Sequence, residues 1–101
     1  MWILRRSDDQ ASTFRFPRGT SRTVGRAHGA DFILDAALVS RLHCRLTAGD
    51  ERLEIEDLSS TNGTFVNGRR VKKAHLGHGD RLRVGRVELT IEKRPIARAD
   101  S

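Results

Sequence analysis

Cysteine, proline and aromatic residues are scarce in this chain of 101 residues. The single cysteine, Cys44, excludes an intramolecular disulfide. We interpret it as a small buried residue in a reducing compartment, with a catalytic thiol as the alternative. The N-terminal apolar stretch 2–4 is far too short for a signal sequence or a membrane span. We therefore expect an intracellular, cytoplasmic protein that does not use a membrane.

Helical periodicity is also missing, because no window of about 11 residues or more sustains it. Residues 36–40 could form a single turn at most. The chain shows no internal repeat and no low-complexity tract, and its length suits one small domain with one core. A helical fold is thereby excluded.

Short stretches of alternating apolar and polar residues are present instead. Leu53 and Ile55, for example, alternate with charged residues, which predicts a strand with one buried face. Asn67-Gly68 and Gly85-Arg86 are typical of tight turns. The pattern predicts an all-β, mostly antiparallel sandwich or barrel. The predicted strands are residues 2–5, 13–16, 22–25, 31–34, 43–47, 52–56, 64–66, 82–84 and 87–91, with a hairpin loop at 48–50.

The charge of the chain favours an acidic partner. Its net charge is +6 and its pI is about 11.0. Phosphopeptides, nucleic acids and anionic membrane surfaces all fit this charge, and the charge alone does not choose among them.

Three polar groups at predicted strand ends suit a phosphate presented on a peptide. Arg26 follows Gly25, and its guanidinium could bind a phosphate with two hydrogen bonds, although a solvated surface charge is the alternative. The hydroxyl and the backbone N–H of Ser40 could both donate to an anion, unless the residue only caps a turn. In the polar loop 59–64, Asn62 could pair with a peptide C=O and N–H, or could be incidental to a hairpin turn.

A hydrolase is a remote alternative, because Ser40 could be paired with His43 and Asp57. However, the chain has no Gly-x-Ser-x-Gly motif and no helix follows the serine. We interpret His43 as a structural histidine that bonds neighbouring backbone.

No cofactor and no metal site are predicted. The spacing of the other histidines does not fit a metal site, and no acidic or cysteine cluster completes a coordination shell. The glycines form no phosphate-binding nucleotide loop. These histidines are His28, His75 and His78.

Taken in order, four motifs resemble those of the forkhead-associated (FHA) domain. They are Gly25-Arg26, Ser40-Arg41-x-His43, Ser60-Thr61-Asn62-Gly63-Thr64 and Val66-Asn67-Gly68, and residues 80–85 resemble that family's late strand. The resemblance implies a β-sandwich of about 11 short strands that binds phosphothreonine peptides through loops at one end. We assign residues 1–93 to this domain and residues 94–101 to a loose basic tail or the start of a linker.

The resemblance also implies a role for each matching residue. Arg26 and Ser40 match the main phosphate ligands, and Arg41 matches a position that contacts phosphate or peptide. Thr61 matches a residue near the phosphothreonine, and Asn62 matches the asparagine that holds the peptide main chain.

Other matching positions shape or brace the loops; they are Gly25, His43, Gly63, Asn67 and Gly68. The region that reads the third residue after the phosphothreonine falls around Leu38 and 85–87 and reveals no preference.

The sequence thus predicts a binding module and not an enzyme. Its expected partners are proteins that Ser/Thr kinases have phosphorylated on threonine. Phosphate-independent interaction or self-association on the same fold is the alternative, although it would need neither Arg26 nor Ser40 nor Asn62. Nucleic-acid binding is less expected, because aromatic residues for base stacking are few.

Overall fold

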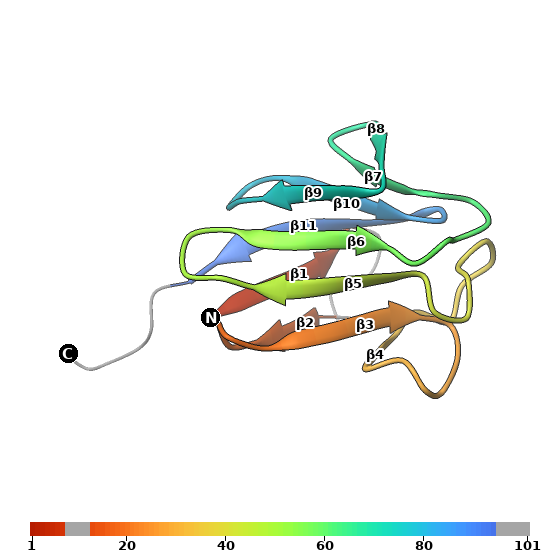
Figure 1. Ribbon diagram of the computed structural model, residues 1–101, viewed down its shortest axis with the longest axis horizontal. Coiled ribbons are helices and arrows are strands. Elements are labelled where there is room, and N and C mark those ends of the chain that lie inside the picture. The colour runs from red at the N-terminus through yellow and green to blue at the C-terminus, as the bar shows by residue number, and fades with distance from the viewer. Residues whose placement is uncertain (8–12, 95–101) are drawn as a thin grey trace.

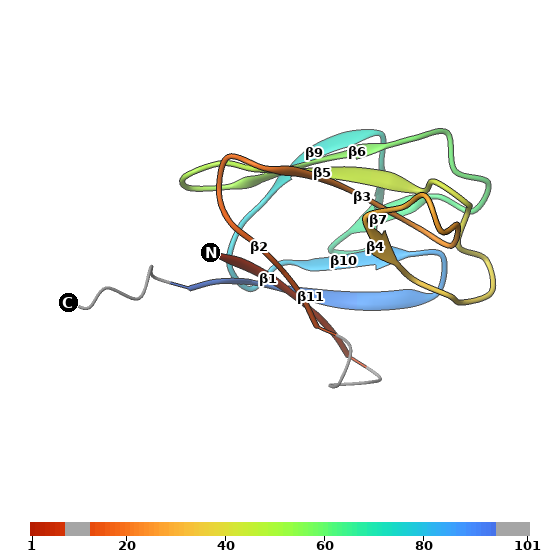
Figure 2. The same cartoon turned by 90° about the horizontal axis from the view of Figure 1, so that it is seen from below.

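The computed structural model describes residues 1–7 and 13–94. Apart from Arg94, the predicted tail 94–101 lies outside these residues. The described part contains eleven strands in two sheets and no helix, which confirms the predicted all-β sandwich (Figures 1 and 2). Accordingly, none of it is a helix long and apolar enough to cross a bilayer.

The two sheets lie face to face, as the turned view shows (Figure 2). Every strand pair is antiparallel except β3 with β4. The six-stranded sheet has the order β2 (Thr13–Phe16), β1 (Trp2–Arg6), β11 (Val87–Lys93), β10 (Arg81–Val84), β7 (Thr64–Val66) and β8 (Arg69–Val71). The five-stranded sheet has the order β4 (Phe32–Ile33), β3 (Ser21–Gly25), β5 (Cys44–Ala48), β6 (Leu53–Asp57) and β9 (Lys73–Leu76).

The core lies between the sheets and follows the alternation of the sequence. Leu53 and Ile55 are fully buried, as are Leu82 and Val84 on the facing sheet. Cys44 is also fully buried in this core, as predicted, and burial raises the pKa of its thiol. A buried neutral thiol is a poor nucleophile, so the core interpretation of this residue holds.

The turns follow their predicted chemistry with one difference in length. Asn67 and Gly68 both have positive φ, 50° and 86°, and join β7 to β8 in a two-residue hairpin. Gly85-Arg86 likewise joins β10 to β11. The β5–β6 loop runs over 49–52 and not 48–50, because Ala48 still pairs in the ladder.

Strands β8 and β9 were not predicted from the sequence. Both lie at sheet edges and are short, and the run 69–73, which covers β8 and the start of β9, holds four arginines and lysines. An edge strand buries little of one face, so the alternation that reveals central strands is weak there.

Four connections gather at one end of the sandwich, on the right in Figure 1. They are the β3–β4, β4–β5, β6–β7 and β10–β11 connections, whereas the N-terminus lies at the other end. The loops that carry the predicted binding residues therefore share one surface.

Candidate functional site

Backbone hydrogen bonds join the β3–β4 loop to the β4–β5 loop. The N–H of Arg26 donates to the Ser40 carbonyl at 3.0 Å, and the N–H of Ala27 donates to the Arg41 carbonyl at 3.1 Å. The β6–β7 loop joins them, because the N–H of Thr61 donates to the Ser40 hydroxyl oxygen at 3.1 Å. Hydrogen bonds thus bring two other predicted ligand residues, Arg26 and Thr61, to Ser40.

Gly25 allows this approach because it has no side chain. A Cβ at this position would lie 2.0 Å from the Arg41 carbonyl oxygen and 2.9 Å from the Leu42 Cα. Any larger residue would push the β4–β5 loop away from β3, and with it the bonds that Arg26 makes.

His43 lies fully buried between two of the loops. Its Nδ1 accepts the N–H of Ser40 at 3.0 Å, and its Nε2 lies 2.8 Å from the Gly63 carbonyl oxygen. Since the first partner can only donate and the second can only accept, the ring must be the neutral tautomer that carries its proton on Nε2. The ring bonds the N–H of Ser40 and not its hydroxyl, so it does not form a nucleophile–base pair.

This geometry corrects one expectation about Ser40. Its backbone N–H is already bonded to His43, so only the hydroxyl hydrogen remains to donate to an anion. The next N–H, that of Arg41, makes no hydrogen bond among residues 1–7 and 13–94. The second donor is therefore one residue later than expected.

Within residues 1–7 and 13–94, the guanidinium of Arg26 is held at one nitrogen only. Its Nε donates to the Val39 carbonyl at 3.1 Å, which leaves both terminal nitrogens available. The exposed side chain lines a depression of about 430 Å³ together with His28 and Arg41. Two arginines thus face one solvent-filled hollow.

Asn62 is likewise positioned by one of its donors. Its Nδ2 donates to the Leu38 carbonyl at 3.1 Å, which leaves a second N–H and the amide oxygen unused. Leu38 has the positive φ of 71°, and a Cβ on Gly85 would lie 2.6 Å from its carbonyl oxygen. The two regions expected to read the third residue after a phosphothreonine, Leu38 and 85–87, therefore lie in contact.

Asp57 organises the β6–β7 loop, a role that sequence reasoning missed. It accepts the hydroxyls of Ser60 at 2.5 Å and Thr64 at 2.6 Å, and the N–H of Ser60 at 3.1 Å. The Ser60 hydroxyl in turn accepts the N–H of Gly63. Burial opposes ionisation, but these hydrogen bonds hold the pKa of Asp57 below its ordinary value. The spacing Asp57-x-x-Ser60 is a known local signal for such a turn.

The remaining matched residues lie at different distances from this loop surface. Gly63, with a φ of 94°, offers its carbonyl to His43. Asn67 and Gly68 form the β7–β8 hairpin, where Asn67 accepts the N–H of Arg81 at 2.9 Å. Among the hydrogen bonds of the described residues, none joins Asn67 to Arg26 or Ser40. The described residues also contain no group of three side chains suited to a metal.

Comparison with known proteins gives a consistent result. The model of a family described as "FHA domain" matches residues 22–85. The chain is 39% identical over 88 residues to the ABC transporter ATP-binding/permease protein Rv1747 of Mycobacterium tuberculosis. It is 32% identical over 97 residues to an oxoglutarate dehydrogenase inhibitor of Corynebacterium diphtheriae. These matches cover 87% and 96% of the chain but only 10% and 67% of the two relatives.

A solved structure shares the whole architecture. A chain from a study of phosphothreonine-dependent FHA domain interactions superposes with a TM-score of 0.85 at 33% identity. The match covers 94% of this chain and 98% of the other.

Replacing Gly25 with alanine should disturb the loop surface. The new Cβ would overlap the Arg41 carbonyl, so Gly25→Ala should lower the free energy of unfolding by about 1–3 kcal/mol. Gly29→Ala is the matched control, because its Cβ would meet nothing within 4 Å. Denaturant unfolding of both variants measures the difference, and equal stabilities would contradict the close approach.

The stability of the domain should depend on Asp57 at acidic pH. Because its folded pKa lies below the ordinary 3.8, the carboxylate stabilises the fold above that value and loses the effect as pH falls through the folded pKa. Asp57→Asn should therefore cost about 1–3 kcal/mol at neutral pH and flatten the pH dependence below about pH 4.

Unfolding titrations between neutral and acidic pH test this, with Asp50→Asn as the control. Asp50 makes only an exposed ion pair with Arg18 at 3.4 Å, so its replacement should change little. The same acid profile in wild type and Asp57→Asn would refute the role of the carboxylate.

Proposed function

Since the chain belongs to the FHA domain family, we propose that it is a module that binds phosphothreonine-containing segments of partner proteins. The observation that supports this best is the backbone hydrogen bond from the Arg26 N–H to the Ser40 carbonyl, which holds the residues that carry the guanidinium and the hydroxyl side by side on two loops. A structural relative comes from a study of phosphothreonine-dependent interactions. The proposed domain comprises residues 1–93.

The phosphate would lie in the hollow beside Arg26 and Arg41. The free terminal nitrogens of Arg26 can bind two phosphate oxygens, and the Ser40 hydroxyl and the Arg41 N–H can donate to the group. Because Arg26 is already anchored through Nε, less side-chain entropy would be lost on binding.

The peptide main chain would pair with Asn62. Its remaining N–H and its amide oxygen match a peptide C=O and N–H, and Thr61 lies beside it at the Ser40 hydroxyl. The partners would be substrates of Ser/Thr protein kinases in the cytoplasm. Phosphate-independent binding on the same fold is the competing proposal, and an unphosphorylated peptide distinguishes the two.

Replacing Arg26 should abolish measurable phosphopeptide binding. Removing one member of a charge-assisted pair costs roughly 2–5 kcal/mol, which would move an affinity near 1 μM, or about −8 kcal/mol, toward the millimolar range. Arg26→Lys should also bind much more weakly, because lysine lacks the two-pronged geometry. Calorimetry should compare a phosphothreonine peptide, its unphosphorylated twin, a phosphoserine twin and single-stranded DNA.

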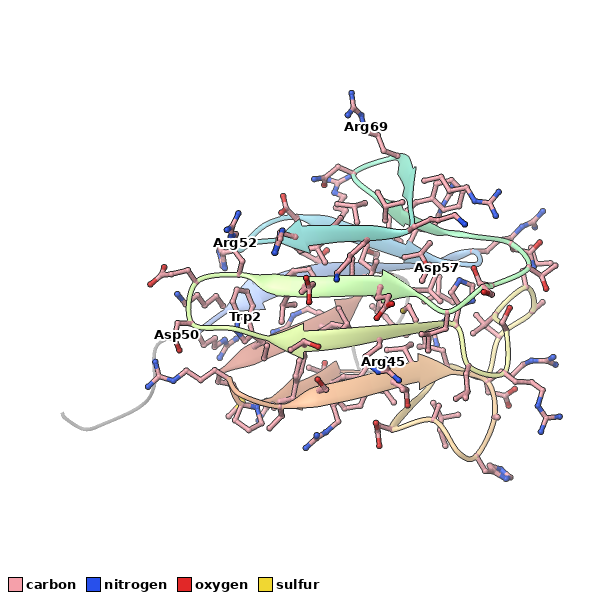
Figure 3. All side chains as sticks on the ribbon, viewed as in Figure 1. Trp2, Arg45, Asp50, Arg52, Asp57 and Arg69 are labelled. Carbon is pink, nitrogen blue, oxygen red and sulfur yellow. The ribbon has the colours of Figure 1, made fainter. Side chains whose placement is uncertain are left out.

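Arg45→Ala is the control, since Arg45 on β5 (labelled in Figure 3) pairs with Glu56 at 3.7 Å and does not line the hollow beside Arg26. Binding of Arg26→Ala within about threefold of wild type would place the site elsewhere. Equal binding of Arg26→Lys would mean that only general electrostatics matters. Phosphothreonine should be preferred over phosphoserine by roughly tenfold, through burial of its methyl group and its stiffer χ1; equal binding would remove the methyl contact alone.

Asn62→Ala should affect the peptide more than the phosphate. Peptide main-chain groups left unpaired would cost about 1–3 kcal/mol, whereas free phosphate has no such groups. Competition experiments with the phosphopeptide and with inorganic phosphate measure both effects. Proportional losses would instead mean that Asn62 acts by holding Leu38 and the phosphate loop.

A further inference from the structure

The outer face of the six-stranded sheet carries an arginine-rich groove, which shares no lining residue with the hollow beside Arg26. The register of β7 places Phe65 opposite Arg70 on one side and Arg83 on the other. The guanidinium of Arg83 lies over the Phe65 ring, 4.1 Å from its centroid. This cation–π contact holds the guanidinium over the ring, and the N–H groups at the edge of the guanidinium can still donate to a partner.

We call this depression the arginine groove, and its volume is about 550 Å³. Arg70 lies beside it on β8, opposite Phe65, whereas Arg69 belongs to the other face of that strand and projects into solvent at the sheet edge (Figure 3). Its lining residues are Phe65, Asn67, Gly68, Arg81, Arg83 and Glu88.

The arginines of the groove are not neutralised within the described residues. Glu88 stands opposite Arg83 in the β10–β11 register, yet no ion pair joins them or involves Arg81 in residues 1–7 and 13–94. The nearby Asp80 is occupied, since its two oxygens accept from Asn67 and from a backbone N–H. Three other strand cations have acidic partners: Arg5 with Glu92, Arg45 with Glu56 and Lys73 with Glu54.

The hairpin that the phosphate site leaves unused forms one wall of this groove. Asn67 accepts the N–H of Arg81 and donates its own N–H to the Arg81 carbonyl, which ties the hairpin to β10. Gly68 adds no side chain, and a Cβ there would meet nothing within 4 Å, so this side stays open. The motif residues Asn67 and Gly68 thus have a place outside the loop surface.

The chemistry of the groove favours an acidic polypeptide. Guanidinium groups bind carboxylates with paired hydrogen bonds. Nucleic acid fits less well, because Arg83 covers the half-buried aromatic ring that a base would stack on. We propose that the arginine groove is a second, phosphate-independent binding surface for an acidic segment of a partner protein.

The test measures the affinity for a labelled peptide rich in glutamate, without phosphate, at low ionic strength. The variant Arg81→Gln/Arg83→Gln should weaken binding about fivefold or more, as expected for two exposed charge contacts. Arg45→Gln/Arg52→Gln is the matched control, because it removes the same charge from β5 and the β5–β6 loop (Figure 3). The control should change the affinity less than about twofold.

Two further arms make the outcome decisive. Arg26→Ala should keep the affinity for the acidic peptide, and Arg81→Gln/Arg83→Gln should keep that for a phosphothreonine peptide, so either site can fail alone. Equal losses in the groove and control variants, or no binding by wild type, would overturn the proposal. Tighter binding of oligothymidylate of equal charge, lost in the groove variant, would also overturn it. If that variant does not fold, the single variant Arg81→Gln replaces it.

Discussion

The bridge through His43 is the interaction on which the loop surface depends. One buried ring accepts from the Ser40 backbone and donates to the Gly63 carbonyl, and so fixes two loops that lie 20 residues apart in sequence. Only one neutral tautomer satisfies both bonds, and a buried ring with an unpaired nitrogen would be costly. Ser40 in turn positions two residues of the neighbouring loops, because the N–H of Arg26 donates to its carbonyl and the N–H of Thr61 donates to its hydroxyl oxygen.

Each proposed ligand group is likewise held by one hydrogen bond within the protein and has further donors or acceptors available. The Nε of Arg26 donates to a carbonyl and its terminal nitrogens stay available. One N–H of the Asn62 amide donates to a carbonyl, and the other N–H and the amide oxygen stay available. The Ser40 hydroxyl accepts a bond and keeps its hydrogen. Each group is therefore positioned before any ligand arrives, and the entropy of ordering it is contributed by folding and not by binding.

Much of the fold could be predicted because central strands bury one face. The alternation at Leu53 and Ile55 reveals β6, but β8 and β9 lie at sheet edges, where β8 has no fully buried residue and β9 has one. The family motifs led to the prediction that Arg26 and Asn62 are ligand residues. They could not reveal which donors are already used, so the N–H of Ser40 was misjudged. Its partner depends on how the ring of His43 turns, which no residue pattern encodes.

The arginine groove was invisible in the sequence for a different reason. Arg81 and Arg83 alternate with buried residues, so they look like the solvated face of a half-buried strand. Only the register brings Arg83 onto Phe65, and only the absence of a close carboxylate distinguishes it from Arg45, which pairs with Glu56 on the other sheet. An outward arginine becomes available to a partner when its neighbours leave it unpaired. Strand order decides that, so the same topology that buries the core also determines which charges stay free.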